Sequence, residues 1–122
     1  MSLAARHLEA NGIPTIIIGS ARDIVEHCGV PRFLFTDFPL GNPTGPPYQR
    51  ALQHQIMGLA LNLLATATTP RTTLAAPIQW TGDPDWRPRY GHVDPAEITR
   101  HRAAGEARRR HQAEAAQKRD AT

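Results

Sequence analysis

Cysteine is almost absent from this sequence, and its scarcity limits the compartments and the chemistry open to the protein. The single cysteine, Cys28, cannot form an internal disulfide, so nothing points to an oxidising compartment. No stretch approaches the run of roughly 18 to 20 apolar residues that spans a bilayer, and the N-terminus lacks the apolar core of a signal peptide. These features predict a cytoplasmic protein that does not insert into a membrane.

Signatures of metal and nucleotide binding are also missing. The six histidines show no metal-ligand spacing, and no C-x-x-C pair accompanies them. The glycines form neither a G-x-G-x-x-G pattern nor a phosphate-binding P-loop. The sequence therefore predicts no metal site and does not support a nucleotide site.

Charge is nearly balanced, so neither part of the chain is basic enough to indicate nucleic acid by itself. The formal net charge is +3. The region from Asp94 onward contributes +2, from seven Lys or Arg against five Asp or Glu. Its three consecutive arginines at 108–110 could contact a phosphate backbone, but nearby glutamates are typical of a solvated helix face. Nucleic-acid binding through residues 100–119 is the least favoured interpretation.

Short helical and β-branched segments alternate through the first part of the chain. We expect a helix at 2–11, a strand at 15–18, a helix at 21–28, a strand at 33–36 and an edge-like strand within 71–80. Ser20 is the expected N-cap of the second helix. Helix and strand in tight succession indicate an α/β domain with a small, mostly parallel sheet and flanking helices.

The longest helical segment, 48–67, and the C-terminal segment have opposite characters. The first is apolar almost all round, which predicts burial against the sheet and against a partner element. The second opens with Asp94-Pro95-Ala96-Glu97, a capping-box-like start, but has almost no large apolar side chain after Ile98. We therefore expect one α/β domain over residues 1–93 and a polar, basic helical or disordered tail over 94–122.

The loop 37–47 is the most informative segment. It holds four prolines and two glycines, and it follows the carboxyl end of a strand, where open α/β sheets bind ligands. Because Pro39 and Pro43 fix their own φ angles, Gly41 and Asn42 are expected to take positive φ. The candidate cleft residues are Asp37, Pro39, Gly41, Asn42, Pro43 and Gly45. From these residues alone, a ligand site and a rigid subunit-contact loop are equally open.

Cys28 is the one candidate nucleophile, because a thiolate is reactive and His27 precedes it. Adjacent helical residues point about 100° apart, so His27 is poorly placed to activate the thiol. The favoured interpretation is a small, partly buried cysteine near a helix end.

Three segments together resemble one known family. They are Asn11-Gly12-Ile13-Pro14-Thr15-Ile16-Ile17-Ile18, Val30-Pro31-Arg32 and Phe38-Pro39-Leu40-Gly41-Asn42-Pro43. The family is the selenoprotein B component of the glycine, sarcosine, betaine and D-proline reductases. There a helix ending in G-I-P leads to a strand, a second helix and a strand followed by a P-L-G-N-P or P-L-G-D-P loop. The similarity covers residues 3–67, with a weaker continuation to Trp80.

The resemblance implies reductive cleavage of a C–N bond by a selenocysteine or cysteine redox motif, with electrons supplied by thiols. In the family that motif lies directly before the helix equivalent to 3–11, where this sequence has Met1 and Ser2. The redox centre is therefore expected upstream of Met1, as after a selenocysteine codon read as a stop, or on a partner. The expected partners are other reductase subunits or a thiol electron donor. The alternative is a non-catalytic interaction subunit, for example of a homo-oligomer.

Overall fold

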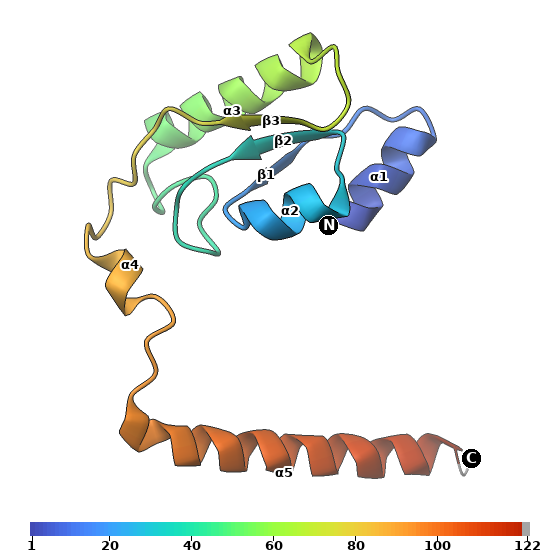
Figure 1. The fold of residues 1–122 in the computed structure, drawn as a ribbon, viewed down its shortest axis with the longest axis vertical. Helices are drawn as coiled ribbons and strands as arrows, with labels where there is room; N and C mark the ends of the chain where they lie inside the picture. Colours follow the sequence, from blue (N-terminus) through green and yellow to red (C-terminus); the bar gives the residue numbers. More distant parts are fainter. Residues whose placement is uncertain (121–122) are drawn as a thin grey trace. The chain divides into compact units, whose positions relative to one another are not determined.

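The computed structural model describes residues 1–120 (Figure 1), so the last two residues of the predicted tail, 121 and 122, lie outside the described residues. The elements are α1 (Ser2–Ala10), β1 (Ile17–Gly19), α2 (Arg22–Cys28), β2 (Arg32–Phe35), α3 (Arg50–Thr66), β3 (Thr72–Ala75), α4 (Trp86–Arg89) and α5 (Pro95–Asp120). The three strands form one parallel sheet in the order β1-β2-β3. This confirms the predicted α/β fold with a small parallel sheet and flanking helices.

The chain divides into two units, of which Met1–Arg87 holds the sheet and the second begins at Pro88. The second unit contains α5, and none of the described side chains of this helix is buried. Asp94 caps α5 as predicted, because its Oδ1 accepts a hydrogen bond from the Ala96 N–H at 2.9 Å. Glu97 does not complete a capping box; its carboxylate pairs with Arg100 at 2.7 Å instead.

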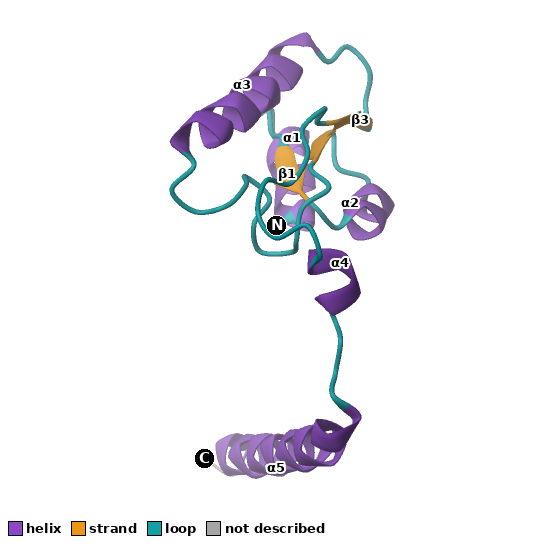
Figure 2. Cartoon of the chain, turned by 90° about the vertical axis from the view of Figure 1, so that its left-hand side faces the viewer, coloured by secondary structure: helices purple, strands orange, loops and turns teal. Residues whose placement is uncertain are grey.

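Helices cover both faces of the sheet (Figure 1 and Figure 2). Leu34 of β2 points to one face, where it packs with Phe38 and with Ile56 and Ala60 of α3. Its neighbour Phe33 points to the other face and packs with Val25 and Val30 at α2. Because successive side chains of a strand alternate between faces, β2 contributes buried side chains to both layers of the core.

The two crossover connections have opposite hands. β1, β2 and β3 are neighbours in sequence order, so both connections step across the sheet in the same direction. Their helices, α2 and α3, cover opposite faces, and therefore one crossover is right-handed and the other left-handed. Left-handed crossovers are rare because a right-twisted strand favours the other hand. Strands of three or four residues accumulate little twist, which reduces that preference here.

Three predictions about where elements begin or end are wrong: the cap of α2, the start of β1 and the end of β3. Ser20 does not cap α2, which has Ala21 at its N-cap without a side-chain bond; the Ser20 hydroxyl lies 3.4 Å from the Thr36 hydroxyl. Thr15 is outside β1 because Glu9 binds its backbone N–H. β3 ends at Ala75 and does not continue toward Trp80, since a proline, which lacks an N–H, follows two residues later.

α3 departs from expectation in its start and its burial. It begins at Arg50, because Tyr48 adopts a left-handed backbone conformation with φ 65°. One face of the helix is buried, through Ile56, Ala60 and Leu63. Within residues 1–120 the other side is not covered, since Met57 is 45% exposed and Leu61 is 58% exposed. Burial of that side against a partner element stays a prediction.

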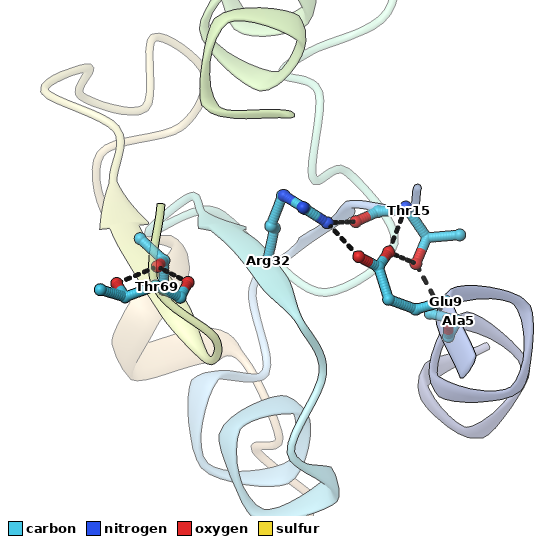
Figure 3. A network of polar contacts seen from close by, with 6 residues as sticks. Ala5, Glu9, Thr15, Arg32 and Thr69 are labelled. Carbon is cyan, nitrogen blue, oxygen red and sulfur yellow. Dashed lines mark hydrogen bonds and ion pairs between the residues drawn. The ribbon is translucent and has the colours of Figure 1, made fainter. Parts of the chain in front are cut away.

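A carboxylate at the amino end of the sheet ties α1 to β2 (Figure 3). Glu9 accepts a hydrogen bond from Arg32 Nη1 at 2.7 Å and another from the Thr15 N–H at 2.7 Å. The Thr15 hydroxyl donates to the Ala5 carbonyl at 3.0 Å. These contacts, led by the hydrogen bond from Arg32, hold the pKa of the Glu9 carboxyl below its usual value.

Acid should therefore weaken the first unit through Glu9. A carboxyl whose pKa is lower in the folded chain stabilises the fold above its unfolded pKa, about 4.3, and loses that contribution as the pH falls through the folded value. We expect Glu9→Gln to lower Tm at neutral pH by several degrees, at about 4–8 °C per kcal/mol for a domain of this size. The difference from the unchanged protein should shrink below about pH 4.

Glu26→Gln is the matched control, because Glu26 forms an exposed pair with Arg22 one helical turn away at 3.0 Å. Such a pair contributes about 0.3–0.5 kcal/mol, so Tm should hardly change. Melting curves of the three proteins between about pH 3 and pH 7 make the comparison. Equal effects of the two substitutions at neutral pH would contradict a special role for Glu9.

Candidate functional site

Thr36, the first residue after β2, fastens the loop 37–47 to the carboxyl end of the sheet. Its side chain is fully buried, and its hydroxyl donates to the Pro43 carbonyl at 2.8 Å. Its backbone N–H donates to the Gly19 carbonyl at the end of β1 at 2.9 Å. The loop consequently turns back onto the end of β2, next to the end of β1.

Two consecutive turns give the loop its shape. The Asn42 N–H donates to the Pro39 carbonyl at 3.0 Å, and the Gly45 N–H donates to the Asn42 carbonyl at 3.0 Å. Gly41 has φ 93° and occupies the third position of the first turn, where type II turns need positive φ. The prediction for Gly41 is confirmed. The prediction for Asn42 is wrong, because one left-handed residue suffices for this turn and Asn42 already starts the next.

Gly45 lets the loop approach α3 closely. It is buried and has φ 97°, and a Cβ at this position would lie 2.8 Å from Leu52 Cδ2. Pro39, Gly41, Asn42, Pro43 and Gly45 thus determine the shape of the loop. Asp37 is the candidate that also brings a charged side chain to a cavity.

The cavity at Asp37 lies beyond the carboxyl ends of β2 and β3. It has a volume of about 260 Å³ and is lined by Asp37, Ile78, Gln79, Trp80, Trp86 and Arg87. Asp37 follows β2 by two residues, and the run Ile78–Trp80 begins three residues after β3. The position of the cavity agrees with the general rule that open α/β sheets bind ligands at the carboxyl ends of their strands.

The cavity presents charges of both signs beside aromatic walls. Asp37 and Arg87 form an ion pair between side chains that are 57% and 60% exposed. The Arg87 guanidinium lies over the Trp86 ring, 4.8 Å from its centroid. Because exposed pairs are worth only about 0–1 kcal/mol, this pair opens readily for a ligand that satisfies both charges.

Trp80 forms the inner wall. Its ring packs against Phe38 at a centroid distance of 5.4 Å, which joins the cavity to the core. Its Nε1 is buried and has no hydrogen-bond partner among residues 1–120. The segment that covers the indole passes very close, since a Cβ on Gly82 would lie 2.6 Å from Nε1.

Cys28 is not part of this arrangement. It ends α2, four residues before β2 begins, and so lies toward the amino end of the sheet. Cys28 lines a separate hollow on α2 of about 360 Å³ with Asp23, Ile24 and His27. No hydrogen bond joins it to His27 within the described part of the chain. The structure therefore does not bring this thiol together with the loop.

Two general searches of the described residues bear on the class of site. Residues 1–120 contain no group of three or more His, Cys, Asp or Glu side chains that could hold a metal ion. No helix in the same range is long and apolar enough to cross a membrane.

The cavity contains residues that the sequence analysis did not single out. Trp80, Trp86 and Arg87 lie in a turn-rich stretch, about fifty positions from Asp37. One signal was available: both tryptophans of the chain fall within seven residues of each other. Known protein families, characterised proteins and solved structures give no match to this chain.

Gly41→Val tests the shape of the loop. A Cβ at Gly41 has nothing within 4 Å, so the cost comes from the left-handed backbone alone. We expect the substitution to lower the free energy of unfolding by about 1–3 kcal/mol. Urea denaturation with linear extrapolation measures it.

Gly58→Ala is the contrasting control. Gly58 lies within α3, also with nothing within 4 Å of an added Cβ, but in a helical conformation. Alanine should stabilise the helix there by about 0.5–1 kcal/mol. A silent Gly41→Val would show that the loop does not hold the conformation described.

Proposed function

We propose that this chain is a substrate-holding part of a reductase of the selenoprotein B type. The observation that carries the proposal is the cavity in which Asp37, Arg87 and two tryptophans converge beyond the carboxyl ends of the strands. The resemblance of 3–67 to that family adds the reaction class, which is reductive cleavage of a C–N bond.

The charges of the cavity suit a small zwitterion. Arg87 offers a planar donor for a carboxylate, and Asp37 offers an acceptor for an ammonium group. An aromatic face beside Asp37 favours an ammonium further, including an alkylated one, through cation–π attraction. Glycine, sarcosine, betaine and D-proline, the substrates that the resemblance implies, all carry this pair of charges.

The electrons come from elsewhere in this proposal. Reductive cleavage consumes two electrons, and a chain with one cysteine cannot cycle between a dithiol and an internal disulfide. Cys28 does not line the cavity. A selenol or thiol from a partner subunit, or from a segment preceding Met1, would therefore reach the zwitterion at the cavity mouth. The single reduced cysteine also agrees with a cytoplasmic location.

Tryptophan fluorescence tests the binding step directly, because both tryptophans of the chain line the cavity. We expect at least one of the four zwitterions to change the emission in a saturable way. Asp37→Asn and Arg87→Gln should each weaken that binding by about 10-fold or more, because each removes a charge-assisted contact.

Arg22→Gln is the control, since Arg22 is paired with Glu26 on α2 and does not line the cavity. It should leave the titration unchanged. Absence of saturable binding for all four compounds would overturn the proposal. Amine release by the purified chain with dithiothreitol alone would overturn the assignment of the redox group to another component.

The exposed face of α3 favours a second candidate, a non-catalytic interaction subunit. Met57 and Leu61 are exposed on a helix that carries no Asp, Glu, Lys or Arg after Arg50. Exposed apolar side chains on an uncharged helix are typical of a covered surface.

Association through α3 should be visible in solution. If this face is an interface, light scattering of the intact chain should show an oligomer, and Leu61→Lys should shift it to a monomer by burying a charge. Lys is tolerated at this position in the monomer, because the side chain is 58% exposed. A monomeric intact chain at every concentration tested would remove self-association.

A further inference from the structure

Three arginines gather at the amino end of the sheet, at the opposite end of the strands from the Asp37 cavity. A hollow of about 340 Å³ is lined by Arg6 of α1 and Arg71, with an uncharged floor that includes Gly29. A second hollow of about 240 Å³ shares Glu9 with the first and reaches Arg32. These two hollows thus hold three arginines and one carboxylate, Glu9, which is paired with Arg32. Arg71 also lines a third hollow with Glu26, whose carboxylate is paired with Arg22.

The hydrogen-bonding capacity of these arginines is largely unused. Glu9 is occupied by Arg32 and by Thr15 (Figure 3). The side chains of Arg6 and Arg71 make no hydrogen bond or ion pair within residues 1–120. The Nε of Arg32 is buried and also lacks a partner there. The first hollow consequently combines two unpaired positive charges with the exposed donors of Arg6 and Arg71, which an acceptor from outside the chain could satisfy.

Arg71 is held in a backbone conformation that suits glycine better. Its φ is 56°, in the left-handed region, directly before β3. Its guanidinium lies over Gly29, where an added Cβ would come within 3.1 Å of Nη2. An unfavourable backbone is retained most often where the side chain has a task. One task is purely structural: the carboxyl end of α2, at Cys28, attracts a cation.

We propose that this surface is a binding site for a small dianionic oxyanion, either inorganic phosphate or the phosphoryl group of a small phosphate ester. Arg6 and Arg71 donate to its oxygens, since guanidinium groups match the geometry of phosphate. Arg32 is neutralised by its ion pair with Glu9, so the excess positive charge comes from Arg6 and Arg71. Two excess charges match a dianion better than a monoanion, and the shallow hollow admits a ligand of this size. The site is independent of the zwitterion cavity.

Calorimetric titration of the intact chain tests the proposal, with inorganic phosphate and glycerol 3-phosphate as probes and acetate as the monoanion. The measurements are made at constant ionic strength and about pH 8, above the second pKa of a phosphate ester, about 6. We expect saturable binding of at least one phosphate probe and none of acetate. Arg6→Gln and Arg71→Gln should each weaken binding about 10-fold. Binding of both probes assigns the site to a phosphoryl group in general, and binding of one assigns it to that source.

Arg71→Gly separates the binding role from the structural one. If Arg71 is retained for binding, glycine should remove the anion affinity and raise Tm without ligand, because glycine adopts φ 56° easily. Arg50→Gln, which lies outside both hollows, should change neither property. The proposal is overturned if neither phosphate probe binds, if acetate binds equally well, or if Arg71→Gly lowers Tm while phosphate affinity persists.

Discussion

The single proton of the Thr36 hydroxyl fixes how the carboxyl end of this sheet is built. Thr36 lies at the end of the central strand, where its backbone N–H bonds to the last residue of β1 and its hydroxyl bonds to the Pro43 carbonyl. The Ser20 hydroxyl and the Gly19 carbonyl are farther from the Thr36 hydroxyl, at 3.4 and 3.5 Å. The Pro43 carbonyl is therefore the acceptor with the shortest hydrogen bond. This contact ties the two loop turns to the end of the central strand, next to Phe38, which packs against Leu34 of the same strand.

The position of the cavity follows from that anchor. Adjacent strands whose connections leave toward opposite faces open a crevice at their carboxyl ends, and β1 and β2 meet this condition. The anchored loop returns to Thr36 at this end of the sheet. The open space is therefore displaced toward β3, where Asp37 meets Trp80 and Arg87. One buried hydroxyl thus decides which pair of strands presents the site.

The sequence predicts the parts of this structure that local chemistry determines. The β-branched run near Ile17, the glycine stop at Gly29 and the Asp94 cap are read from neighbouring residues, and the fold class follows from their order. Gly41 is predictable because a turn between prolines needs positive φ. The position of Ser20 does not follow from its neighbours, because its hydroxyl lies near that of Thr36, sixteen positions away.

The candidate site was only half predictable for the same reason. Asp37 follows a recognisable strand, whereas Arg87 lies fifty positions later in the sequence, beyond α3 and β3. The hydrophobic periodicity of a sequence gives no indication of a contact between two residues so far apart. The apolar composition of α3 shows that its second face prefers to be covered, but not whether this chain or a partner covers it.

The division of charge between the two units affects how strongly copies of the protein repel one another in solution. Residues 1–87 contain six arginines against six aspartates and glutamates, so the unit that holds the sheet has no formal net charge at pH 7. The whole net charge of +3 therefore belongs to the residues from Pro88 onward. A protein near zero net charge loses the electrostatic repulsion that keeps molecules apart in solution. The long polar helix α5 adds no buried side chain to the core, but its positive charge makes copies of the protein repel one another in solution.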